Sequence, residues 1–361
     1  MNQLKQIIKA NLLMRFTKKK SVNFDLKNAR SVLIFRYDRI GDMIITTPLF
    51  RELKNACPEI EISVLASKKN REVIKYNPYI HKVYTNYKNN LIGDFCTLIK
   101  LRKKNFDVCI ELDHSVINHA IIRHKIIKPK KIISIYKYGR YGLSGVDLGI
   151  YDYYTKQDNQ SHFSKLLLEI LVFFGVSSNS TDYDFFLGKS ERKRAISYIS
   201  SFNECLKIGI NIEAFVPEKA IHLNDLKVIC KKLTNNLRNV KIILISSPTF
   251  ISNKNSLINE LDINSLAVLY KTETIIDAAA LIEQLDIVIT PDTSIVHIAS
   301  AFNIPVISIH ENNSESFRLW APKSRLSKTI FSKSKVGLID YDLQEVVDST
   351  LSIVKEINQD N

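Results

Sequence analysis

From residue 31 onward, short runs of consecutive apolar residues alternate with longer stretches in which apolar residues recur every three or four positions. An uninterrupted apolar run is typical of a parallel strand buried on both faces, and the longer period is typical of a helix that covers a sheet. In the first half we expect strands at SVLIFR, EISVLAS, HKVYT, FDVCIEL and KKIISIY, and helices over 42–55, 70–76, 91–103 and 116–124. The pattern therefore predicts an α/β, Rossmann-like half.

The second half repeats this alternation. We expect strands at KIGINI, VKIILIS, LAVLY, DIVIT and PVISIH, and helices over 223–235, 275–285, 294–302 and 343–357. Between the halves, the pattern predicts a long helix over 162–174 and an interdomain linker over 176–204, where polar and charged residues dominate. Two doubly wound domains in tandem bind ligands at the carboxyl ends of their strands, so we expect a site in a central cleft between them.

The expected domain boundaries follow from these elements. A chain of 361 residues is long enough for two domains of ordinary size. We expect a basic amphipathic leader over 1–30, an N-terminal Rossmann-like domain over 31–185, a C-terminal Rossmann-like domain over 200–345, and a C-terminal helix and tail over 346–361.

Composition narrows the partners. The formal net charge of +14 favours an anionic partner, which can be a phosphorylated substrate, an acidic membrane surface or a nucleic acid. A nucleic acid is the weakest of the three, because no recognition motif or aromatic platform stands at a readable spacing. The five cysteines form no CxxC pair, which favours reduced cytosolic thiols over a disulfide framework or a zinc site. No apolar run reaches the roughly 18 residues of a transmembrane helix.

The leader MNQLKQIIKANLLMRFTKKK has helical periodicity. The expected apolar side consists of Leu4, Ile7, Ile8, Leu12 and Leu13, with lysines elsewhere on the helix. Lys9 and Arg15 interrupt the apolar part and no small-residue cleavage site follows, which argues against a signal peptide. Three interpretations stay open: an interfacial helix on an anionic membrane, a helix packed on the protein, or a frayed extension.

The first group of candidate functional residues follows the strand SVLIFR. Arg36, Arg39, Gly41 and Asp42 stand where that strand turns into a helix, at the carboxyl end of the predicted sheet. A carboxylate near a helix start is stabilised as an anion, so Asp42 is either a simple N-terminal acid or a general base. Arg36 and Arg39 can bind the phosphates or carboxylates of an acceptor, or form salt bridges to Asp38 or Asp42.

The second group lies in DIVITPDTSIVHIASAFNIPVISIH, residues 286–310. Pro291 breaks a buried strand, and Asp292, Thr293 and Ser294 are all residue types that cap helices. Helix-start amides, hydroxyls and the His297 imidazole one turn later suit a diphosphate, and the alternative is a capped helix with a packed histidine.

A third, weaker signal is Lys219, in a loop between a strand and a helix. Its ammonium group can reach a phosphate, and a solvated lysine is the alternative. The spacing of His114, His119 and His124 does not align them on one helix face, so we expect no metal site there.

These pieces, in this order, resemble glycosyltransferase family 9, the heptosyltransferases of lipopolysaccharide core assembly. The segments that carry the resemblance are RYDRIGDMIITTPLFREL, PEIEISVLAS, NPYIHKVY, FDVCIELDHS, KTETIIDAAALIEQLD and DIVITPDTSIVHIASAFNIPVISI. The resemblance runs from about residue 31 to 345. It implies the GT-B fold, in which two Rossmann-like domains face a central cleft.

The resemblance also implies residue roles. Asp42 matches the family's general base, and Lys219 matches a phosphate-binding lysine. The residues that match the donor-binding segment are Asp292, Thr293, Ser294, Ile295 and His297. The chain departs from the family in four places: Ser294 stands where glycine is usual, and the NPGA loop reads NIEA, which introduces Glu213. The usual Lys-Arg-Trp reads Lys219-Ala220-Ile221, and the glycine-rich turn after the next strand reads SSPT, residues 246–249.

The function so implied is inverting, metal-independent transfer of heptose from ADP-heptose onto a lipopolysaccharide or lipooligosaccharide core acceptor, with no cofactor beyond the nucleotide-sugar donor. The expected partners are this donor, an anionic glycolipid and the inner-membrane surface, and the expected location is peripheral, on the cytoplasmic face of that membrane. The alternatives are a related transferase with another nucleotide sugar for another surface glycan, and a degenerate GT-B protein that binds without turnover.

Overall fold

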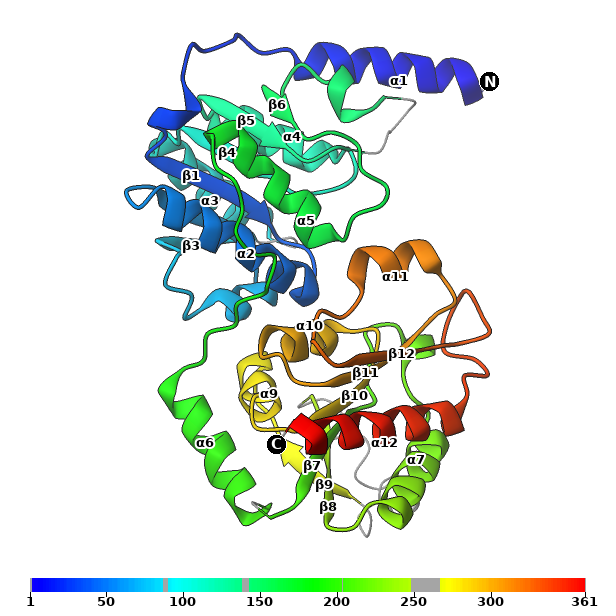
Figure 1. The fold of residues 1–361 in the computed structure, drawn as a ribbon. Helices are drawn as coiled ribbons and strands as arrows, with labels where there is room; N and C mark the ends of the chain where they lie inside the picture. The colour runs from blue at the N-terminus through cyan, green and yellow to red at the C-terminus, as the bar shows by residue number, and fades with distance from the viewer. Residues whose placement is uncertain (1, 87–89, 138–142, 203, 248–266, 361) are drawn as a thin grey trace. The chain divides into compact units, whose positions relative to one another are not determined.

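The computed structural model describes residues 2–86, 90–137, 143–202, 204–247 and 267–360. The chain forms two compact units, Met1–Thr181 and Asp182–Asn361 (Figure 1). Each unit contains a six-stranded sheet in which every strand pairing is parallel. The prediction of two Rossmann-like, doubly wound α/β domains is therefore confirmed.

In the first unit the strands are β1 (Ser31–Arg36), β2 (Glu61–Ser67), β3 (Lys82–Asn86), β4 (Val108–Glu111), β5 (Lys131–Ser134) and β6 (Tyr153–Tyr154). Their order across the sheet is β3-β2-β1-β4-β5-β6. The α-helices are α1 (Asn2–Thr17), α2 (Ile40–Ala56), α3 (Leu91–Lys103), α4 (Asn118–Ile127) and α5 (Phe163–Leu168). The strand order reverses between β1 and β4, so residues that follow these two strands meet at one edge of the sheet.

Both faces of this sheet are covered. Leu33 and Phe35 of β1 belong to a core that includes side chains of α1, α3 and α4. Val32 and Ile34 alternate with them, are 0% exposed, and face the opposite side. The right-handed crossover from β1 to β2 places α2 on that side. There α2 contacts α5. Burial on both faces explains why the strands read as uninterrupted apolar runs.

The second unit is built in the same way. Its strands are β7 (Leu206–Asn211), β8 (Val240–Ser246), β9 (Ala267–Lys271), β10 (Ile287–Pro291), β11 (Val306–His310) and β12 (Ser327–Phe331), in the order β12-β11-β10-β7-β8-β9. Its α-helices are α6 (Lys189–Ile199), α7 (Leu223–Asn236), α9 (Ile275–Ile282), α10 (Ser294–Ala301), α11 (Ser314–Trp320) and α12 (Leu343–Asp360).

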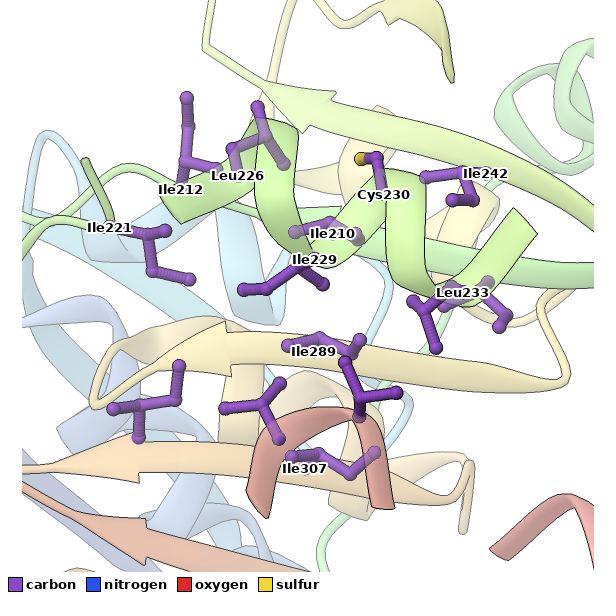
Figure 2. Close-up of a cluster of buried hydrophobic side chains, with 14 of the residues drawn as sticks. Ile210, Ile212, Ile221, Leu226, Ile229, Cys230, Leu233, Ile242, Ile289 and Ile307 are labelled. Atoms are coloured by element: carbon purple, nitrogen blue, oxygen red, sulfur yellow. The ribbon is translucent and has the colours of Figure 1, made fainter. Parts of the chain in front are cut away.

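A continuous apolar core holds this second sheet (Figure 2). Leu226, Ile229 and Leu233 of α7 pack with Ile210 of β7 and Ile289 of β10, and α12 contributes to the same cluster. Burial of one such aliphatic side chain stabilises the fold by about 1.5–3 kcal/mol. The ends of β7 and β10, from which the candidate donor residues project, therefore rest on a rigid base.

Several elements differ from the sequence-based expectations. The helix expected over 162–174 divides into α5 and a 3₁₀ helix, Glu169–Phe174, which ends at Gly175 with φ of +72°. The linker prediction over 176–204 is wrong for residues 189–199, which form α6 and pack against α9. Few of the α6 residues are apolar (KSERKRAISYI), so the periodic signal was too weak to reveal the helix.

The leader helix α1 packs against the first unit, beside its β6 edge (Figure 1). Ala10 and Leu13 are buried in the core of that unit, and Thr17 is 0% exposed. The frayed-extension interpretation is therefore wrong. Among the described residues, no helix has the length and apolar character that a membrane span needs.

Candidate active site

Asp42 lies where the sequence placed it, in the first turn of α2, just past the carboxyl end of β1. One carboxylate oxygen accepts a hydrogen bond from the backbone N–H of Arg39, the N-cap residue, at 3.0 Å. The other oxygen is 3.6 Å from Nη2 of Arg36, and the side chain is 16% exposed. The Asp42 carboxylate is thus held in place by a backbone N–H at the start of α2 and lies beside the guanidinium group of Arg36.

Arg36 is only 2% exposed and is held by groups of its own unit. Its Nε donates to the backbone carbonyl of Asp42 at 3.1 Å, and its Nη1 donates to the Asp38 carboxylate at 3.1 Å. The salt-bridge interpretation of Arg36 is thus what the structure shows, and this burial does not fit direct contact with an acceptor. Arg39 is exposed, and a role in acceptor binding stays a prediction for it.

Asp38 and Asp113 form a carboxylate pair that the sequence reasoning missed. Asp38 follows β1, Asp113 follows the neighbouring β4, and the two carboxyl groups interact electrostatically. Burial, and then repulsion from Asp38, raise the pKa of Asp113 to about 7. A carboxyl group with such a pKa can hold or release a proton near neutral pH.

Beneath this pair lies a fully buried ionic network centred on Glu111. Glu111 and Lys137 are both 0% exposed, with Nζ of Lys137 2.8 Å from the carboxylate. The same carboxylate accepts hydrogen bonds from Tyr151 Oη at 2.9 Å and contacts His124 Nε2 at 2.8 Å. Burial alone would raise the pKa of Glu111, but Lys137 and His124 outweigh it and lower that pKa to about 2. Lys137 also donates to the backbone carbonyl of Asp113 at 2.6 Å, so the network fixes the position of the pair.

The raised pKa of Asp113 predicts a pH-dependent stability. The native state binds the Asp113 proton more tightly than the unfolded chain, whose aspartate pKa is about 3.9, so this contribution is present below pH 4 and is lost as pH rises through 7. Asp113→Asn keeps a neutral side chain at every pH. We expect the free energy of unfolding of the variant, relative to that of the wild type, to increase by on the order of 2 kcal/mol when the pH rises from 5 to 8. Urea unfolding at both pH values measures this, and an equal difference at the two would contradict the raised pKa.

In the second unit, the start of α10 provides a potential anion site. Thr293 is the N-cap of α10, and its hydroxyl accepts the backbone N–H of Ile295 at 3.3 Å. Asn211, the last residue of β7, donates to the Thr290 hydroxyl at 3.0 Å and to the Thr293 hydroxyl at 3.3 Å. Ser294 is half-buried at the first helical position. The amides of this first turn are the groups that suit a phosphate.

The remaining predicted donor residues have partners within their own unit. His297 is 5% exposed and meets Tyr183 edge-on at 6.0 Å, as a packed histidine does. Asp292 is 4.0 Å from Nδ1 of His310, and burial lowers the pKa of this histidine. Nζ of Lys219 is 2.6 Å from Glu311, a residue that the sequence reasoning missed. Any role of Lys219 in the expected site therefore also involves the carboxylate of Glu311.

Glu213, the acid introduced into the NIEA loop, is held at the end of β8. One of its carboxylate oxygens accepts a hydrogen bond from the Ser247 hydroxyl at 2.7 Å, and the other accepts the Ser247 backbone N–H. Asn211 accepts the Glu213 backbone N–H at 3.1 Å. The Glu213 carboxylate therefore accepts hydrogen bonds from donors within the second unit.

A single signal would have revealed the missed residues. They are Asp38, Glu111, Asp113, Lys137, Asn211 and Glu311, and each ends a strand or follows one within three residues. In a parallel sheet these ends lie on one edge, which is the edge where ligands bind. A search for polar residues at strand ends would have found them. Among the described residues, no group of three or more His, Cys, Asp or Glu side chains is placed to hold a metal ion.

The sequence profile of glycosyltransferase family 9 (heptosyltransferase) matches residues 98–336. "Putative lipopolysaccharide heptosyltransferase 4" of Escherichia coli strain K12 is 25% identical over 360 residues, which cover 96% of this chain and 92% of that protein.

Solved structures agree on the fold. A family 9 glycosyl transferase from Veillonella parvula has a TM-score of 0.75 at 16% identity, covering 92% of this chain and 99% of its own. The ADP-heptose lipopolysaccharide heptosyltransferase II of Escherichia coli has a TM-score of 0.70 at 16% identity, covering 91% and 99%. At such identities these structures establish the GT-B fold, and the profile match, which spans more than half of the chain, establishes the family. The chain is a glycosyltransferase that belongs to family 9.

Proposed function

We propose that this protein transfers heptose from ADP-heptose to a lipopolysaccharide or lipooligosaccharide core acceptor, with inversion at the anomeric carbon and without a bound metal. The curated relative carries this choice, because its name assigns it to lipopolysaccharide heptosyl transfer and because it aligns with almost the whole chain. Solved relatives with ADP and with a fluorinated ADP-heptose support the donor class. A glycolipid acceptor and a nucleotide-sugar donor meet at the cytoplasmic face of the inner membrane, where we place the reaction.

In the proposed reaction Asp42 is the general base. Its carboxylate takes the proton of an acceptor hydroxyl while that oxygen attacks the anomeric carbon of the donor. The bond from this carbon to the diphosphate breaks, and the nucleoside diphosphate leaves with the bonding electrons. One base and one displacement invert the configuration without a covalent intermediate. The position of Asp42 beside Arg36 and the start of α2 supports this role.

The leaving diphosphate gains negative charge, which the second unit must stabilise. We assign this to the first-turn amides of α10 near Ser294, with Thr293 and Ile295, and to Lys219. An ammonium group has three N–H donors, so Lys219 can bind a phosphate oxygen while it keeps Glu311. Asp292 and His297 complete the proposed donor segment, and Arg39 is the proposed acceptor contact. A fixed cation and oriented amides supply charge stabilisation of the kind a metal ion gives elsewhere.

A second candidate function is transfer from a different nucleotide sugar to another surface glycan. The observation that favours it is the altered donor loop, in which the Glu213 carboxylate occupies the Ser247 amide at the end of β8. A carboxylate at this position changes which hydrogen-bond donors are available to a bound nucleotide. The binding-only alternative has lost its support, because the chain belongs to an enzyme family.

A thermal-shift series tests the donor. ADP and ADP-heptose should raise the melting temperature, because a ligand that binds only the native state stabilises it, by about 2.7 kcal/mol at a hundredfold excess over Kd. GDP-, UDP- and CMP-sugars should have little effect.

Lys219→Ala should weaken ADP binding about tenfold, whereas Lys328→Ala, a change at a lysine half-exposed on β12, should not. Stabilisation by a UDP-sugar alone would favour the second candidate, and loss of transfer in EDTA would contradict metal independence.

A further inference from the structure

Helix α1 is apolar on two opposite faces. Ala10, Leu13 and Thr17 face the core of the first unit and are buried. Ile8 and Leu12, with Phe16, recur every four residues, which places them in one stripe on the side away from that core. Their exposed fractions are 50%, 61% and 51%. The expectation of one apolar side with Leu12 and Leu13 together is therefore wrong, and the side chain of Leu4 lies outside those that the structure describes.

The two faces have different uses. The inner face already anchors α1 through the core contacts and an ion pair between Lys19 and Asp152. The outer stripe stays at least half-exposed, and a stripe of large apolar side chains on a surface helix marks an interaction surface. The helix is thus held by one face while it presents the other.

Charge identifies the partner. Residues 1–24 contain six basic residues and no acidic residue. Lys5, Lys9 and Arg15 are exposed and flank the outer stripe by helical position. Lys125 of α4 adds a further ammonium group 5.7 Å from the Phe16 ring centroid. An apolar stripe whose charged neighbours on α1 are all cations is complementary to a bilayer with anionic headgroups, into which the stripe inserts while the cations bind lipid phosphates.

We propose that the outer face of α1, formed by Ile8, Leu12 and Phe16 with Lys5, Lys9 and Arg15, docks the protein on anionic lipid bilayers. The inference deepens the proposed function, which needs access to a membrane glycolipid, and names the surface that provides it. It stands on the residues of α1 and needs no donor, acceptor or turnover.

The test is sedimentation of the full chain with vesicles of phosphatidylcholine containing about one-third phosphatidylglycerol, in the absence of donor and glycolipid acceptor. The variant Ile8→Ser/Leu12→Ser/Phe16→Ser keeps the buried face intact, unlike a deletion of the leader. We expect at least a tenfold lower partition coefficient for it and an unchanged melting temperature. Lys5→Gln/Lys9→Gln/Arg15→Gln should remove the preference for phosphatidylglycerol over pure phosphatidylcholine.

Val336→Ser/Ile339→Ser is the matched control, because it removes exposed apolar side chains from the second unit. Unchanged vesicle binding by the α1 triple-serine variant, or an equal loss in the control, would overturn the proposal. So would a wild-type protein that binds no vesicles but forms a dimer that the triple-serine variant cannot form, since a second copy would then cover the face. Vesicle binding by a protein inactive with every donor would leave the docking proposal standing and remove the proposed function.

Discussion

Asp42→Asn is expected to lower kcat for sugar transfer about a thousandfold, within the range that general-base catalysis contributes. The change removes the basic carboxylate that is to take the acceptor proton. It keeps an oxygen that can accept the backbone N–H of Arg39, so the first turn of α2 retains its hydrogen bond. Donor affinity should stay unchanged, because the proposed donor residues lie in the second unit. Transfer kinetics and ADP titration on the same preparation measure both quantities.

The control must separate lost basicity from lost charge or lost fold. Asp25→Asn removes a carboxylate that caps another helical turn of the same unit, where it accepts the backbone N–H of Lys27. We expect this control to keep wild-type turnover. If Asp42→Asn retained turnover within about tenfold of the wild type, the base assignment would be wrong, and Asp113 would be the next carboxylate to test.

The largest expected effect on stability comes from Glu111→Ala. It leaves the ammonium group of Lys137 buried, 0% exposed and without its carboxylate. Removal of one partner of a buried ion pair costs about 3–5 kcal/mol. Because the pKa of Glu111 is lowered in the native state, the wild type holds this advantage above about pH 4 and loses it as pH falls towards 2. Urea unfolding at pH 7 and at low pH measures the difference.

A double-mutant cycle shows whether the pair or the packing is responsible. Glu111→Gln/Lys137→Met removes both charges and keeps similar volumes, so it should be more stable than the sum of its single changes indicates. Thr350→Val, at a fully buried polar position in α12 of the second unit, controls for the loss of a buried polar group elsewhere. Additive single and double effects would mean that Glu111 and Lys137 act independently.

Local signals were enough for much of the site. Asp42 and Thr293 could be placed at strand-to-helix junctions because an apolar run, a change of period and a capping residue all lie within about ten neighbouring positions. Local signals failed for α6, whose residues are mostly polar or charged, and for the two-residue β6. Such elements exist because of the surfaces they pack against, and those surfaces are distant in the sequence.

The sequence by itself determined the alternation of most strands and helices, the two-domain architecture and the positions of Asp42 and the Thr293 segment, because periodicity and capping are properties of neighbouring residues. It did not reveal β6, α6, α11 or β12. Only the tertiary structure decided that β4 lies beside β1, which brings Asp113 to Asp38 and builds the Glu111 network beneath them. It also decided that Arg36 is buried and that α1 has an inner and an outer face. These features depend on contacts between residues far apart along the chain, and a local pattern does not encode which distant surfaces meet.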